Sequence, residues 1–86
     1  MTGSYSVSVK RSAEKELRGV RGRELRRLIE HIRALAQKPR PAGVEKLSTL
    51  ERYRVRQGDW RILYEIDDGA RVVTIVKVGH RKEVYR

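Results

Sequence analysis

The sequence predicts an α+β fold, a single small domain in which an N-terminal strand and two helices pack on one face of a twisted antiparallel β-sheet. Polar and apolar residues alternate near the N-terminus, apolar residues then recur at helical spacing, and alternation returns in the second half of the chain. Because the chain has only 86 residues, it can bury one modest hydrophobic core. We therefore expect residues 1–86 to form one domain.

The first expected elements are a strand and a short helix. Tyr5, Val7 and Val9 alternate with polar neighbours, which is the pattern of a half-buried strand. Ser12 is the expected N-cap of a helix that continues until Gly22 interrupts it. The strand should thus lead directly into the first helix.

A second, longer helix should begin after Gly22 and end before Pro39, because proline cannot continue a helix. Its apolar residues form a wide stripe at intervals of three and four positions, made of Leu25, Leu28, Ile29, Ile32, Leu35 and Ala36. The opposite face carries Arg23, Arg26, Arg27, Arg33 and Lys38. Such a strip is ordinarily a solvated face, although similar strips also dock acidic partners or RNA.

The second half of the chain predicts a β-meander that follows a loop. The loop should cover residues 39–50, and the strands should cover 52–57, 60–66 and 71–78, with turns at Gly58-Asp59 and Asp68-Gly69. The first turn pairs Arg56 with Arg61 and Val55 with Ile62, and the second pairs Ile62 with Ile75 and Tyr64 with Val73.

This register sorts the side chains onto two faces. One face should take the helices, because it collects Tyr53, Val55, Trp60, Ile62, Tyr64, Ile66, Val73 and Ile75. The other face holds three arginines beside mostly apolar residues, namely Arg54, Arg56 and Arg61 with Leu63, Thr74, Val76 and Val78. Like charges directly opposed on neighbouring strands destabilise a sheet by up to ~1 kcal/mol per pair. Arg56 against Arg61 therefore needs a compensating anion, for which phosphate is the natural candidate.

The composition indicates which kinds of binding partner and which cellular compartment suit this protein. Lysine and arginine total 21 against 11 acids, a net charge of +10 that favours a polyphosphate or an acidic protein as partner. The chain has no cysteine, and we expect His31 to be solvated, with no partner at metal-ligand spacing. No stretch reads as a signal peptide or a membrane span. We expect a cytoplasmic protein that uses neither a metal nor a small-molecule cofactor.

An ordered set of segments carries a resemblance to a known family. These segments are an opening strand followed by helices, GVEKL at 43–47, RYRVRQGDWRILYEI at 52–66 and VGHRKEVY at 78–85. Together they resemble the RelE/ParE superfamily of type II toxin-antitoxin systems over essentially the whole chain. The resemblance implies a RelE-like toxin domain that is neutralised by an antitoxin wrapped around it. In RelE-like members the toxin enters the ribosomal A site and cleaves mRNA there.

The resemblance also implies which residues act. The family's basic pair on the first strand of the meander falls on Arg54 and Arg56, and its later site residues fall on Arg61, Arg81 and Tyr85. The reaction that the resemblance implies is attack of a ribose 2′-OH on the adjacent phosphate, without a metal. Arginine suits the task of holding charge on the phosphorane, because its planar fork grips phosphate oxygens and stays charged. We assign Arg61 and Arg81 to that task.

The identity of the general base stays open at this point. Some members carry lysines where this chain has Arg54 and Arg56, and arginine does not readily lose a proton. Tyr85 could stack on the nucleotide or accept the proton, and His80 could transfer a proton near neutral pH. Trp60 is expected to belong to the core.

Two other functions compete with the nuclease. A ParE-like toxin resembles this chain in fold yet acts on DNA gyrase and lacks the basic constellation with its terminal tyrosine, so Arg61, Arg81 and Tyr85 favour the nuclease. A non-catalytic RNA-binding module would use the same arginines to hold phosphate without any reaction.

Overall fold

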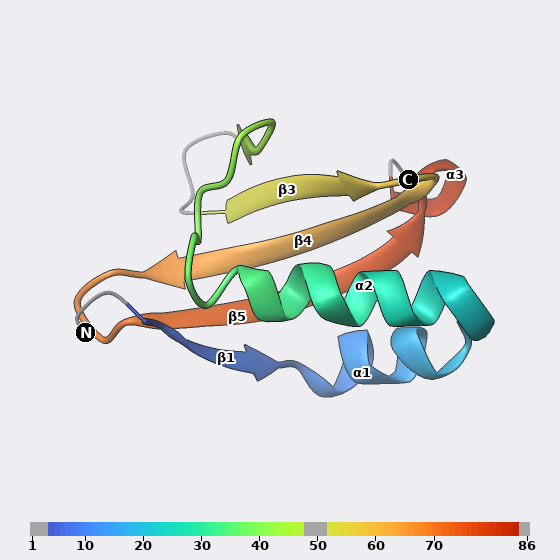
Figure 1. Cartoon of the computed structure of the whole chain (residues 1–86), viewed down its shortest axis with the longest axis horizontal. Helices are drawn as coiled ribbons and strands as arrows, with labels where there is room; N and C mark the ends of the chain where they lie inside the picture. The colour runs from blue at the N-terminus through green and yellow to red at the C-terminus, as the bar shows by residue number, and fades with distance from the viewer. Residues whose placement is uncertain (1–3, 48–51, 85–86) are drawn as a thin grey trace.

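The computed structural model describes residues 4–47 and 52–84, which form one α+β domain around a single sheet (Figure 1). Its elements are β1 (Ser6–Val9), α1 (Arg11–Arg18), α2 (Gly22–Ala34), β2 (Glu45–Leu47), β3 (Arg52–Gln57), β4 (Trp60–Asp67), β5 (Val72–His80) and α3 (Arg81–Val84). The strands lie in the order β1-β5-β4-β3-β2. Figure 1 shows α1 and α2 beside each other along the sheet, so the predicted fold class is confirmed.

The sheet is antiparallel except at one edge. Strand β1 pairs with β5 in parallel, with Val7 opposite Val73, whereas a purely antiparallel sheet was expected. The other edge is β2, which pairs with β3 and falls inside the segment predicted to be a loop. Because β2 has only three residues, its sequence is too short to show the alternation of polar and apolar residues that predicts a strand.

The predicted register is right for the first hairpin and wrong for the second. In the first, Arg56 lies opposite Arg61 and Val55 opposite Ile62. In the second, Tyr64 pairs with Ile75 rather than with Val73, and Ile62 pairs with Val78.

A longer turn and a bulge explain the error in the second hairpin. The turn spans residues 68–71, where the Asp67 carboxylate accepts the Ala70 N–H and Arg71 adopts a φ of 58°. Val76 has no partner in the pairing, which makes it the extra residue of a β-bulge. Beyond the bulge, the side chains of β5 point to the opposite faces from those expected. Val78 is therefore buried in the core and does not lie on the arginine face.

The hydrophobic core lies between the helices and the sheet. Its buried side chains come from α1 and α2, from the residues just after each of these helices, and from β3, β4 and β5. They are Ala13, Val20, Leu28, Ile32, Leu35, Tyr53, Val55, Ile62, Tyr64, Ile66, Val73, Ile75 and Val78. The expected core residue Trp60 is only partly buried and packs against the edge of this cluster. Its indole N–H donates to a carboxylate oxygen of Glu24 at 3.3 Å.

The helices differ in detail from the prediction. Helix α1 begins one residue before Ser12, and its N-cap is Lys10, which makes no side-chain capping bond. Ser12 is therefore not the N-cap. The break comes at residues 19–21, and Gly22 begins α2 with a φ of 65°, a conformation that glycine adopts without strain. His31 on α2 is half-buried, with Nδ1 3.0 Å from Oε1 of Gln57, and is not solvated as expected.

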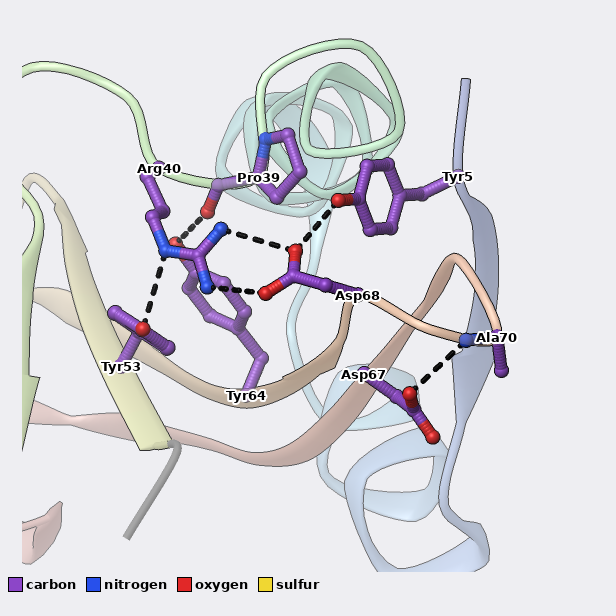
Figure 2. Close-up of polar contacts among 8 residues, drawn as sticks. All are labelled: Tyr5, Pro39, Arg40, Tyr53, Tyr64, Asp67, Asp68 and Ala70. Carbon is purple, nitrogen blue, oxygen red and sulfur yellow. Dashed lines mark hydrogen bonds and ion pairs between the residues drawn. The ribbon is translucent and has the colours of Figure 1, made fainter. Parts of the chain in front are cut away.

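A polar cluster fastens one end of the sheet (Figure 2). Asp68 accepts a bond from the Tyr5 hydroxyl at 2.6 Å and a two-pronged ion pair from Arg40. The Arg40 Nε donates to the Tyr53 hydroxyl at 3.1 Å, and the Tyr64 hydroxyl donates to the Pro39 carbonyl at 2.6 Å. The cluster thus ties the start of β1, the segment after α2 and the β4–β5 turn together.

Candidate active site

The other end of the sheet carries the candidate site. Figure 1 places the β3–β4 turn, the end of β5 and α3 together there, opposite the β4–β5 turn and the polar cluster. The backbone N–H of Arg81 donates to the carbonyl of Asp59 at 2.7 Å, which joins α3 to the turn. The Arg81 side chain is exposed, with Nε 3.9 Å from a carboxylate oxygen of Asp59. The predicted site residue Arg81 is thereby held close to the strands that carry Arg56 and Arg61.

Arg61 is a buried cation at the centre of this end. Only 7% of the residue is exposed, yet Arg61 is not one of the residues of the hydrophobic core. On strand β5 the residue opposite Arg61 is Gly79. The Nη1 of Arg61 donates to the carbonyls of Gly58 and Trp60, each at 3.0 Å. Its Nε is buried and has no hydrogen-bond partner. Leaving such a donor unpaired costs about 1–3 kcal/mol, and an anion reaching it would recover that cost.

Arg56 adds a second cation directly beside Arg61. Arg56 is exposed and lies opposite Arg61 in the β3–β4 ladder. Among the side chains that the structure describes, in residues 4–47 and 52–82, no carboxylate forms an ion pair with either guanidinium. Two like charges placed in this way repel each other by up to ~1 kcal/mol. An anion bound between them would relieve the repulsion.

Arg54 is paired with a carboxylate that sequence reasoning missed. Its Nη2 and Nε lie 2.8 and 3.1 Å from Oε1 of Glu45, and its side chain is 15% exposed. The hydrogen bond from Arg54 is the main cause that lowers the pKa of Glu45, and the positive charges of Arg54, Arg56 and Arg61 lower it further. Glu45 lies within GVEKL, so pairing that segment with β3 would have placed it opposite Arg54.

His80 lies at the border of the same end. Its half-buried ring meets the Trp60 ring edge-on, with 5.7 Å between the centroids. The backbone N–H of Lys82 donates to its Nδ1 at 3.4 Å, which leaves Nε2 as the ring nitrogen available for a proton transfer. Tyr85, the remaining predicted site residue, lies outside the described residues.

The arrangement can hold an anion, and it has the carboxylates of Glu45 and Asp59 near the arginines. Within the described residues, no group of three or more histidine, cysteine, aspartate or glutamate side chains could hold a metal ion. No helix in the described part of the chain is long and apolar enough to cross a membrane. The described part of the site is a cationic surface bordered by the carboxylates of Glu45 and Asp59.

Comparison with known proteins defines the class. Residues 7–85 match the family described as the ParE toxin of the type II toxin-antitoxin system parDE. The chain belongs to this RelE/ParE family of toxins. It is 31% identical over 84 residues to Toxin RelG of Mycobacterium tuberculosis, covering 95% of this chain and 97% of that protein.

Solved structures extend the likeness to the fold. The toxin-antitoxin complex RelBE2 of M. tuberculosis contains a chain that matches with a TM-score of 0.83 and 27% identity, over 96% of this chain and 98% of that one. The intact RelBE complex of E. coli contains a chain that matches with a TM-score of 0.80 and 20% identity, over 90% and 96% of the two chains. Both relatives were crystallised with an antitoxin, and both confirm the RelE-like architecture.

Proposed function

We propose that this toxin is a ribosome-dependent endoribonuclease, an mRNA interferase that cleaves mRNA in the ribosomal A site by attack of a ribose 2′-OH on the adjacent phosphate. The observation that carries the proposal is the pair of opposed arginines, of which Arg61 has a buried, unpartnered Nε and Arg56 is exposed beside it. A phosphate diester supplies the anion that this pair lacks. The likeness to RelG and to the RelBE2 toxin supports the RelE branch of the family.

Three tasks follow from the reaction. A base must take the proton of the 2′-OH, cations must hold the charge that builds on the phosphorane, and an acid must protonate the departing oxygen. Arg61 and Arg81 take the second task, since Arg61 is fixed by two carbonyls and Arg81 is anchored to Asp59 through its backbone. Arg56 contributes charge from the adjacent strand.

Glu45 is our candidate for the base. An arginine at 54 or 56 stays protonated. The Glu45 carboxylate is charged at neutral pH and can accept a proton, although its lowered pKa makes it a weaker base than an unpaired glutamate. Arg54 fixes one of its oxygens, and this contact orients the other. Nε2 of His80 or the hydroxyl of Tyr85 would then protonate the departing oxygen. Alternatively, the Tyr85 ring would stack on the nucleotide.

One finding favours a second candidate function. The family that matches residues 7–85 is described as a ParE toxin. A ParE-like function is the alternative noted in the sequence analysis, in which the toxin acts on DNA gyrase. The arginines at the end of the sheet are the feature that the gyrase-directed members lack. A non-catalytic RNA-binding module remains the third outcome of the experiment below.

The partner that we propose is an antitoxin encoded with the toxin, in the cytoplasm. Relatives of this chain were crystallised with their antitoxins. The net charge of +10 favours an acidic or amphipathic antitoxin segment, because an open basic surface would bind nucleic acid indiscriminately.

Primer-extension mapping of a message on translating ribosomes tests the proposal. We expect new cuts within the A-site codon when the purified toxin is added, and their loss with the Arg81→Ala variant. Intact message together with trapped gyrase cleavage complexes would establish the ParE-like function. Intact message with retained, salt-sensitive RNA binding would establish the binding module.

A further inference from the structure

A cavity borders the cationic site along the edge of strand β3 that faces away from β4. Its volume is about 350 Å³, and its lining residues are His31, Ala42, Gly43, Glu45, Val55 and Arg56. Glu45 and Arg56 therefore line this cavity and also belong to the proposed cleavage site. Its volume falls within the range of small-molecule sites, roughly 300–1,000 Å³.

The cavity exists because strand β3 is covered over only half its length. Strand β2 pairs with residues 52–54 and stops at the pair of Glu45 with Arg54. Gly43, with a φ of 85°, carries the preceding loop away from the sheet. Figure 1 shows the outer edge of the second half of β3 without a neighbouring strand, while α2 passes along the sheet below it.

The lining suits a planar heterocycle. His31 is half-buried and held by Gln57 across the gap between α2 and β3, so its ring is fixed rather than free to rotate. Arg56 offers a second flat surface, Val55 offers an apolar wall, and Glu45 offers a carboxylate acceptor. Proteins that read single-stranded RNA stack its bases on histidine or arginine planes and bind the base edges through such polar groups.

We propose that this cavity binds the nucleobase next to the scissile phosphate and that His31 is a specificity-determining residue. The inference rests on the proposed nuclease function and adds a base subsite to it. The phosphate would lie at Arg56 and Arg61, and the chain of the RNA would turn over the edge of β3 so that one base enters the cavity. The identity of this base would then influence which codons are cut.

The first test is binding of nucleoside 5′-monophosphates to the intact toxin, followed by NMR. The chain has only two histidines, so the ring signals of His31 and His80 are readily distinguished. We expect the His31 signals to move with at least one of the four nucleotides and to move much less with inorganic phosphate. Equal shifts with phosphate and with every nucleotide would overturn the base subsite.

The second test is the codon profile of cleavage for His31→Ala, with Arg33→Ala as the matched control. Arg33 lies on the same helix, is exposed and does not line the cavity. We expect His31→Ala to flatten the preference among A-site codons several-fold, whereas Arg33→Ala should keep the parent profile. Ala42→Leu, which adds bulk to the cavity lining and leaves His31 and Gln57 unsubstituted, should have the same effect as His31→Ala if the latter folds poorly.

The two tests separate the subsite from the nuclease. An unchanged codon profile in both cavity variants would overturn the subsite and leave the nuclease standing. A parent protein that cuts no message would overturn the nuclease, and the nucleotide titration would then decide the subsite alone.

Discussion

The Glu45 carboxylate lies 2.8 Å from the Arg54 guanidinium across the short β2–β3 ladder, and this ion pair borders the surface where Arg56 and Arg61 oppose each other. The pair places an acid beside cations that cannot act as a base. It also occupies one cation, so that the remaining arginines are left to bind phosphate. Glu45 therefore supplies the proton acceptor, whereas Arg56 and Arg61 supply the positive charge.

Glu45→Gln should lower the cleavage rate by roughly 100- to 10,000-fold, the usual contribution of a general base. The substitution keeps an oxygen for Arg54 but removes the proton acceptor. The fold should survive because Glu45 is exposed. Single-turnover cleavage on programmed ribosomes measures the effect, and a rate within a few-fold of the parent would reassign the base to His80 or Tyr85.

The pH dependence of cleavage separates Glu45 from His80. Because the pKa of Glu45 is lowered from its ordinary value of 4.5, the carboxylate stays charged as the pH falls, and activity should hold to below pH 4.5 before the base is lost. A cleavage rate that falls as the pH drops from 8 to 4.5 would instead exclude Glu45 as the base. A rate profile between pH 4.5 and 8 decides between the two residues, with ribosome integrity controlled at each pH.

Arg81→Ala should reduce cleavage by roughly 100- to 1,000-fold, the effect of removing one donor that stabilises developing charge. Its side chain is exposed, so the melting temperature should not change. Lys82→Ala is the matched control, since it removes a neighbouring exposed cation whose side chain makes no described contact. Equal losses in the two variants would mean that only net charge matters.

Arg61→Leu should separate activity from stability. The substitution removes the phosphate-holding cation and should abolish most cleavage, yet it also removes a buried Nε that has no partner. An unpaired buried donor costs about 1–3 kcal/mol, so we expect the free energy of unfolding to stay within about 1 kcal/mol of the parent or to rise. Urea unfolding measures it, and a marked loss of stability would show that the two carbonyl bonds of Arg61 hold the fold.

Asp68→Asn should destabilise the protein in a pH-dependent manner. Hydrogen bonds from Arg40 and then Tyr5 lower the pKa of Asp68 to about 2 from an ordinary 3.8. A carboxylate with a depressed pKa stabilises the fold above its unfolded pKa and loses this effect as the pH falls through the folded pKa. The difference between parent and variant in urea should thus be full at pH 7 and shrink below pH 4. A constant difference would point to packing instead of charge.

The first hairpin could be predicted from the sequence because a two-residue turn leaves a single register. The second could not, because its four-residue turn and the extra residue at Val76 do not alter the alternation of apolar residues that was used to align the strands. The same bulge explains why Val78 was assigned to the wrong face.

The candidate site was predicted in part for similar reasons. Arg54, Arg56 and Arg61 follow from the first register, and Arg81 follows from the resemblance. The burial of Arg61 was missed because it depends on Gly79 and on the turn carbonyls, which come from other strands and loops. Glu45 was missed because a three-residue strand gives no pattern from which its partner could be inferred.

The most direct test of the nuclease uses a message in which the A-site nucleotide that carries the attacking hydroxyl is replaced by its 2′-deoxy analogue. Programmed ribosomes carrying the all-ribose message or the substituted message are treated with the toxin, and the fragments are sized and their ends identified. We expect cleavage of the ribose message, with a cyclic phosphate and a 5′-hydroxyl at the cut, and no cleavage at the deoxy position. Equal cutting of both messages would exclude the 2′-OH attack, and two intact messages would exclude the ribosome-dependent nuclease.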